Sequence, residues 1–296
     1  MLLHHWRPPP DGSARVTNFG DELNTVLWPK LLGDSFFDDD AGVMFVGIGS
    51  LLGWPKSGDQ TRRHRIVFGS GAAFAGAAER EPADPRWHVY CVRGPSTVAA
   101  YGLDAALGIA DPAILVSDFY NRSDTTHRFG YMPHLTEARE WSSLLADVCT
   151  EMGVRYIDPR DDVEKVLAAI GSVSVMVAEA MHGAVVADAL RVPWVPVYTT
   201  RRPHRFKWTD WCSSMDLEYA PRWIGNASSW AARGGLRGGV LDRAAASLFA
   251  ARFGRVVARA TPMLSSDAVH ADRIDRLHVA LAALQSDVSI GRYAPG

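Results

Sequence analysis

Short runs of consecutive apolar residues alternate along the chain with stretches whose apolar positions recur at helical spacing. Runs without polar alternation are typical of parallel strands that are buried on both faces. Strands are predicted at 43–49, 65–71, 88–92, 128–134, 154–159, 173–179 and 194–199. Helices are predicted at 22–32, 95–103, 137–152, 162–170, 182–190, 240–260 and 267–284. This alternation predicts an α/β protein built on parallel sheets.

A polar segment at 117–127 interrupts the alternation and divides it into two halves. The chain has 296 residues, which at about 150 residues per domain favours two domains. We therefore predict an N-terminal domain at 1–120 and a C-terminal domain at 121–296 that includes the last two helices. Two such halves would face each other across a cleft, and open parallel sheets bind ligands at the carboxyl ends of their strands.

Composition and charge restrict the class of partner. Apolar residues make up 47%, charged residues make up 22%, and the net charge is −2. This charge gives no general attraction to nucleic acid or to an anionic membrane, so any anion site must be local. No HxxxH, HExxH or CxxC pattern occurs, so no metal site is expected.

The cysteines and the start of the chain indicate a cytoplasmic protein. Cys91, Cys149 and Cys212 are far apart in the sequence, which suits reduced thiols in a reducing compartment. The first residues, MLLHHWRPPP, are too polar and too rich in proline for a signal peptide. No apolar run approaches the roughly 20 residues that a bilayer span needs.

The stretch Glu-Ala-Met-His-Gly (179–183) joins a predicted strand to a predicted helix. His182 and Gly183 would then lie in the first turn, where free amides and the positive end of the helix dipole favour an anion. Gly183 would let a ligand approach the backbone, and His182 can donate a hydrogen bond or a proton near neutral pH. The alternative is a capping histidine beside a packing glycine, and position alone leaves both open.

The stretch Asn-Phe-Gly-Asp (18–21) precedes an amphipathic helix in the same way. If Asp21 faces the cleft, it would repel an anion, so it suits a hydroxyl ligand or the role of general base. The alternative is that Asp21 only caps the helix.

Three further stretches follow predicted strands. GIGSLL (47–52) and VFGSGAAF (67–74) are glycine-rich turns that can expose backbone amides, although neither matches a nucleotide-binding fingerprint. Arg93 ends the strand at 88–92 and could hold a carboxylate or phosphate with two hydrogen bonds, or form an ordinary interdomain ion pair. The stretch RRPHRFKWTDW (201–211) is predicted to be a cationic loop with aromatic residues, which suits an anionic sugar-linked ligand. Single-stranded nucleic acid also binds such mixtures, but the negative net charge argues against it.

Six motifs occur in a fixed order: NFGDELN, GIGSLL, VFGSG, VRGPST with GLDAALGIADPAIL behind it, YMPH, and EAMHGAVVADALRVPWV. Together, over roughly residues 16 to 215, they resemble the polysaccharide pyruvyl transferase family, in particular its bacterial exopolysaccharide members. The resemblance implies a GT-B-like fold, with two Rossmann-like domains facing a cleft, the acceptor on the N-terminal side and the donor on the C-terminal side.

The resemblance also implies an activity. Pyruvate would pass from phosphoenolpyruvate to two hydroxyls of a sugar, giving a cyclic ketal and phosphate, with phosphoenolpyruvate as co-substrate and no other cofactor. Arg93 and His182 match the family's donor-binding positions, and Asp21 matches an early aspartate, so these three are the expected catalytic residues. Substrate binding is expected at Asn18, Gly20, Gly49, Ser70, Gly71, His134, Glu179, Met181, Gly183, His204, Arg205 and Lys207. Ala180 stands where many members carry an arginine, and the HRFKW cluster is a substitute source of positive charge.

Two other functions stay open. A GT-B glycosyltransferase that uses a nucleotide sugar would share the architecture, and a non-catalytic homologue could bind a sugar or an anion without reaction. The acceptor implied by the resemblance is a lipid-linked oligosaccharide at the inner face of the cytoplasmic membrane, which implies peripheral membrane association.

Overall fold

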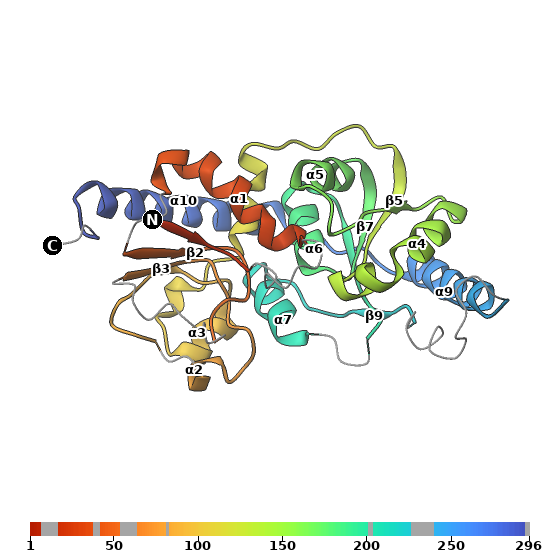
Figure 1. Cartoon of the computed structure of the whole chain (residues 1–296), viewed down its shortest axis with the longest axis horizontal. Helices are drawn as coiled ribbons and strands as arrows, with labels where there is room; N and C mark the ends of the chain where they lie inside the picture. The colour runs from red at the N-terminus through yellow and green to blue at the C-terminus, as the bar shows by residue number, and fades with distance from the viewer. Residues whose placement is uncertain are drawn as a thin grey trace, which may run out of the picture.

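The computed structural model describes residues 1–6, 17–37, 42–53, 64–80, 83–200, 204–225 and 240–293, with only the backbone of 240–245. Two parallel sheets organise the chain (Figure 1), which confirms the predicted α/β class. The first sheet has the order β1-β2-β3-β4 and contains β1 (Leu2–His4), β2 (Val43–Val46), β3 (His64–Phe68) and β4 (Trp87–Cys91). Strand β1 was not predicted, because three residues carry too little pattern.

The second sheet has the order β6-β5-β7-β8-β9. Its strands are β5 (His127–Met132), β6 (Arg155–Tyr156), β7 (Val173–Ala178), β8 (Trp194–Tyr198) and β9 (Arg222–Trp223). Every described strand pair of both sheets is parallel. Strand β9 was missed because it is two exposed residues long. The order in which the chain adds strands reverses direction between β5 and β7, and open parallel sheets bind ligands at such a point.

The helices follow the predicted alternation. They are α1 (Phe19–Leu32), α2 (Ala77–Arg80), α3 (Pro95–Tyr101), α4 (Leu135–Glu151), α5 (Val163–Gly171), α6 (Met181–Ala189), α7 (Arg205–Ser214), α9 (Val240–Arg259) and α10 (Asp267–Ser289). Three 3-10 helices are described as well: η1 (Asp34–Phe36), η2 (Ala105–Leu107) and η3 (Pro112–Asp118).

Helix α7 corrects one prediction, since 201–211 was expected to be a loop. Trp208, Trp211 and Cys212 are buried at helical spacing on α7, and the ring of Trp211 lies 5.2 Å from that of Trp194 on β8. Burial of these side chains therefore fixes a helix inside a sequence whose cationic residues suggested a solvated loop. Arg201 and Arg202 of that stretch lie outside the described residues.

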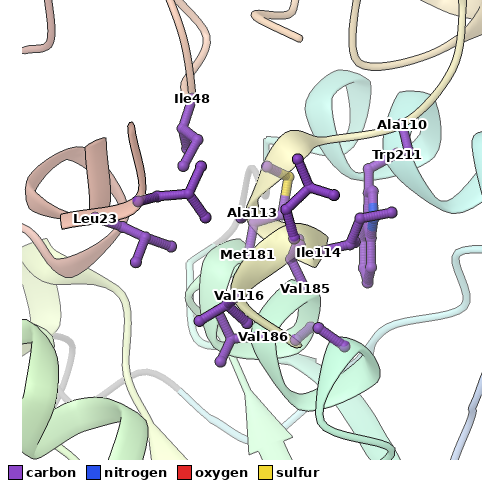
Figure 2. Packing of buried hydrophobic residues seen from close by; sticks show 14 of the residues in the cluster. Leu23, Ile48, Ala110, Ala113, Ile114, Val116, Met181, Val185, Val186 and Trp211 are labelled. Atoms are coloured by element: carbon purple, nitrogen blue, oxygen red, sulfur yellow. The ribbon is translucent and has the colours of Figure 1, made fainter. Parts of the chain in front are cut away.

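A single hydrophobic cluster connects the two halves. Figure 2 shows Leu23 of α1 beside the side chains of η3 and of α6, with Met181 and Val185 facing Ile114. Helix α6 therefore packs with its apolar residues against the first half, while its first turn stays at the edge of the second sheet. This packing brings residues from 17–24 and from 179–183 together.

The predicted boundary at 117–127 falls between the strands of the two sheets. Helix α10, however, lies along the first sheet (Figure 1), and Tyr90 on β4 donates a hydrogen bond of 2.5 Å to Asp287 on α10. The division at residue 120, the Rossmann-like character of each half and the GT-B-like arrangement stay predictions.

Candidate functional site

Two neighbouring cavities lie at the carboxyl ends of β5 and β7. Open parallel sheets bind ligands where the strand order changes direction, and in the second sheet this point lies between those two strands. The "cationic cavity" has a volume of about 130 Å³, and the "aromatic cavity" has a volume of about 220 Å³. His134, Thr136 and Lys207 line both, so the cavities share a wall.

The two linings differ in character. The cationic cavity is lined by Asn18, Phe19, Gly20, Met132, His134, Leu135, Thr136, Arg139, Pro159, Ala180, Met181, His182 and Lys207. The aromatic cavity is lined by His134, Thr136, Glu179, Val197, Tyr198, Thr200, His204, Lys207, Trp208 and Tyr219. Of the predicted substrate-binding residues, Asn18, Gly20, His134, Glu179, Met181, His204 and Lys207 therefore line a cavity.

His182 lies in the first turn of α6, as predicted, and is held between two neighbours. Its Nδ1 edge lies over Gly20, where an added Cβ would come within 1.8 Å of Nδ1. Its Nε2 faces Oδ2 of Asp111 at 3.4 Å. Neither of these two buried atoms has a hydrogen-bond partner in the described part of the chain. The ring orientation is therefore set by a glycine on one side and a carboxyl group on the other.

Asp111 was missed as a site residue. It is fully buried, and its Oδ1 accepts a hydrogen bond of 3.1 Å from the amide of Ala113, which caps η3. Asp-Pro before a helical turn predicts such a cap from sequence. The second oxygen, which faces His182, is visible only once the fold places η3 against α6.

Asp21 lies near His182 but does not cap α1. Asn18 is the N-cap residue, and Asp21 lies inside the first turn, so the capping alternative is wrong. Asn18 Nδ2 donates a hydrogen bond to Asp21 Oδ2. Burial raises the pKa of Asp21, and the hydrogen bond from Asn18 and the nearby charges of His182 and Lys207 oppose that rise. A carboxyl group with a raised pKa is suited to proton transfer.

Lys207 lies at the wall that both cavities share. Burial and the nearby charge of Arg93 lower the pKa of Lys207 to about 8, while Asp21 acts in the opposite direction. Within the described part of the chain, its ammonium group makes no ion pair. A partly desolvated cation without a carboxylate partner is well suited to an anionic ligand.

Arg93 lines neither cavity. Its side chain is fully buried, and its Nε donates a hydrogen bond of 3.0 Å to Asp210 Oδ2. Its Nη1 donates to Ser50 Oγ at 2.7 Å, and its Nη2 donates to the carbonyl of Ala72 at 3.0 Å. These contacts match the ion pair considered as an alternative. A donor-binding role for Arg93 stays a prediction.

Arg139 was not predicted and lines the cationic cavity from the second turn of α4. Ala180 lines the same cavity, and so does Lys207. Position 180 lacks a positive charge, but Arg139 and Lys207 place two cations around the same space. No sequence motif marks Arg139, because it reads as an ordinary exposed position of an amphipathic helix.

Glu179 organises the ends of three strands. Its Oε1 accepts from the amide and the hydroxyl of Thr199 at 2.7 and 2.5 Å. Its Oε2 accepts from the amide of His134 at 3.2 Å and from the hydroxyl of Tyr131 at 3.3 Å. A carboxylate has about four acceptor positions, so this arrangement leaves none for a substrate hydroxyl.

Glu137 lies close to Glu179 and was also missed. It is buried, and its Oε2 has no hydrogen-bond partner among the described residues. Burial, and then the nearby charge of Glu179, raise the pKa of Glu137 to about 7. Glu137 lies outside the lining of the aromatic cavity.

Besides Arg93, the structure places Asp21 and five other predicted residues away from the cavity linings. Ser70 accepts from the amide of Leu51 and donates to the carbonyl of Gly49, and so ties two glycine-rich turns together. A Cβ on Gly71 would come within 2.1 Å of the Arg93 guanidinium. A Cβ on Gly183 would lie 2.9 Å from Met132 Sδ, which is the packing role considered as its alternative. Gly49, Ser70, Gly71, Gly183 and Arg205 line neither cavity.

The described residues also bear on metal binding and on membrane crossing. No group of three or more His, Cys, Asp or Glu side chains there could hold a metal ion. Among the described helices, none is both long enough and apolar enough to cross a bilayer. Cys91, Cys149 and Cys212 are buried free thiols.

Comparisons with known proteins give the family. Residues 60–201 match the polysaccharide pyruvyl transferase family. Over 215 residues the chain is 37% identical to the succinoglycan biosynthesis protein ExoV of Rhizobium meliloti (strain 1021). That alignment covers 69% of this chain and 64% of the relative, so the chain spans less than two thirds of the relative's length. Through this shared region the chain belongs to the polysaccharide pyruvyl transferase family.

Proposed function

We propose that this protein transfers pyruvate from phosphoenolpyruvate onto two hydroxyls of a sugar in an exopolysaccharide repeat unit, forming a cyclic ketal. The observation that carries the proposal is the cationic cavity, where His182, Lys207 and Arg139 surround one small space at the start of α6. Family membership supports polysaccharide pyruvylation in general. The cavity supports the choice of donor.

Phosphoenolpyruvate carries a phosphate and a carboxylate on a three-carbon unit, so it needs at least two cationic or amide-rich anchors. Lys207 and Arg139 supply side-chain cations, and the first turn of α6 supplies backbone amides and the positive end of a helix dipole. The volume of about 130 Å³ suits a small anion better than a nucleotide.

The reaction forms two carbon–oxygen bonds and breaks one. The methylene carbon of phosphoenolpyruvate gains a proton and becomes a methyl group, and the adjacent carbon becomes an oxocarbenium-like centre. One sugar hydroxyl and then the other add to this carbon, while the bond to the phosphate oxygen breaks. Of the two hydroxyl protons, one balances the proton taken up by the methyl group and the other leaves with hydrogen phosphate.

In this scheme His182 delivers the proton to the methylene carbon. The Asp111 carboxyl group lies 3.4 Å from Nε2 and holds the ring in place. Asp21 accepts hydroxyl protons, because Glu179 already accepts four hydrogen bonds. Lys207 and the amides of α6 stabilise the departing phosphate electrostatically.

The proposal also covers the domain arrangement, the acceptor and the membrane association that the sequence led us to expect. The two halves work as facing GT-B-like domains, the acceptor is linked to a lipid at the cytoplasmic face of the membrane, and phosphoenolpyruvate is the one co-substrate. Membrane association is peripheral, and nucleic acid is not a partner.

Donor identity tests the proposal. Phosphoenolpyruvate at millimolar concentration should raise the melting temperature, with and without EDTA, and UDP or GDP should not. Phosphate should then be released from phosphoenolpyruvate in the presence of a galactoside, a glucoside or a mannoside. Stabilisation by a nucleoside diphosphate alone would favour a nucleotide-sugar glycosyltransferase. Donor binding without phosphate release from any acceptor would favour a non-catalytic homologue.

A further inference from the structure

The aromatic cavity differs from the cationic cavity in charge. Burial lowers the pKa of His134 to about 3 and also lowers the pKa of His204, so both imidazoles are neutral at pH 7. Among the described residues of its lining, which leave out 201–203, Lys207 at the shared wall is the one Lys or Arg, and the carboxyl group of Glu179 lies in the same lining. The described residues therefore offer an anion less here than in the cationic cavity, which also has Arg139 in its lining, and they favour an uncharged ligand.

The surface of this cavity combines rings with hydroxyl groups. Tyr198, Tyr219 and Thr200 contribute hydroxyls. The ring of Tyr219 is stacked on that of buried Trp208, with centroids 5.0 Å apart and an interplanar angle of 13°, so the plane of Tyr219 is fixed. Rigid rings with a few placed polar groups are typical of small-molecule sites. The volume of about 220 Å³ is several times the roughly 30 Å³ that one water occupies in the liquid, the scale of one sugar ring.

The position of the cavity matters as much as its lining. His134 and Lys207 stand between the two spaces, so ligands in the two cavities would be separated by single side chains. Transfer between a donor and an acceptor requires this proximity.

We propose that the aromatic cavity binds the acceptor, as an uncharged pyranose whose hydroxyl pair faces the wall formed by His134 and Lys207. The inference rests on the proposed function, which assigns the donor to the cationic cavity. It locates the acceptor ring in the second half of the chain, whereas the sequence predicted the acceptor on the N-terminal side. Tyr219 and Thr200 then determine which sugar is accepted.

Two ligand titrations on the same proteins test the assignment. Methyl galactoside, methyl glucoside and methyl mannoside are titrated by ligand-observed NMR, and phosphoenolpyruvate is titrated by calorimetry. The variants are Tyr219→Leu and Thr200→Val in the aromatic cavity, with Arg139→Ala in the cationic cavity as the matched control. Tyr219→Phe keeps the stacked ring, so it replaces Tyr219→Leu if the latter does not fold. Melting temperatures establish folding.

Variants of each cavity should weaken binding of one ligand and leave binding of the other ligand unchanged. Tyr219→Leu and Thr200→Val should weaken binding of the preferred glycoside by about tenfold, the scale of one ring or hydrogen-bond contact, and leave phosphoenolpyruvate affinity unchanged. Arg139→Ala should do the reverse. Unchanged glycoside affinity, loss of phosphoenolpyruvate affinity in the aromatic-cavity variants, or no glycoside binding to the wild type would overturn the assignment. A wild-type protein that binds a glycoside but not phosphoenolpyruvate would contradict the proposed function instead.

Discussion

Gly20 leaves the space that the imidazole of His182 occupies: a Cβ at Gly20 would lie 1.8 Å from Nδ1 and 2.6 Å from Cγ of that ring. The two residues are far apart in the sequence and meet because α1 and α6 start at the same edge of the molecule. The glycine of the NFGDELN motif is therefore explained by the histidine of the EAMHG motif.

Gly20→Ala should therefore displace His182 without unfolding the protein. Alanine in a helix is favoured over glycine by about 1 kcal/mol, which offsets part of the steric cost. Turnover should fall by about 10²-fold or more, the scale of lost acid–base assistance, with a small change in melting temperature. Gly254→Ala in α9 is a control, because its nearest neighbour, Met152 Cε, lies 3.4 Å from the added Cβ. Equal turnover in the two variants would show that the position of His182 is not critical.

Donor affinity should depend on pH through Lys207. Its pKa is lowered to about 8, so in the free protein the ammonium loses its proton as pH rises through that value. Since an anion binds the charged form, affinity should fall by up to about tenfold per pH unit above pH 8, and binding there should take up a proton. Isothermal titration calorimetry in buffers of different ionisation enthalpy measures both effects. Lys207→Arg should bind with a flat profile, and a flat profile in the wild type would contradict the role.

Arg93 and Asp210 form a buried ion pair at 3.0 Å, with both side chains fully buried. Arg93→Ala leaves the Asp210 carboxylate buried without its partner, which should cost about 3–5 kcal/mol of stability. If the residue is structural, donor affinity in the folded fraction should remain and the double variant Arg93→Met with Asp210→Asn should recover part of the stability. Loss of donor affinity in that folded double variant would instead support the donor-binding role predicted from sequence.

Glu137 should make the protein less stable as pH rises. Its pKa is raised from 4.5 to about 7, so between these values the folded state holds more protons than the unfolded state. Stability from this group is therefore present at low pH and falls as pH rises through that window. Glu137→Gln cannot ionise, so the melting temperature of the variant should rise relative to that of the wild type as pH increases from about 5 to about 8. A constant difference across the window would mean that Glu137 does not titrate there.

Much of the fold could be predicted from the sequence because buried parallel strands read as uninterrupted apolar runs. The strand at 43–46 is buried throughout, the strand at 173–178 is buried at its first and its last three positions, and each matches a predicted run. Helix α7 could not be predicted in this way, since its buried tryptophans are interspersed with Arg205, Lys207 and Asp210, and local charge suggested solvent.

A site residue could be predicted where the local sequence shows both its chemistry and its place in a helix or strand. His182 starts a helix after a strand, and the structure confirms that position. Asp111 and Arg139 could not be found, because their roles depend on which elements meet in space. The sequence left two roles open for Arg93, and the structure shows its guanidinium donating to Asp210, a residue 117 positions away that no local pattern identifies. A role in donor binding stays a prediction.

The most direct test of the central claim follows the proton. The reaction is run in D₂O with phosphoenolpyruvate and the preferred glycoside, and the product is examined by mass spectrometry and NMR. The account predicts a ketal whose methyl group carries one deuterium, one phosphate released per ketal, and no product with His182→Ala. A product that retains an unprotonated methylene group, a His182→Ala enzyme with near-normal ketal formation, or consumption of a nucleotide sugar but not of phosphoenolpyruvate would contradict it.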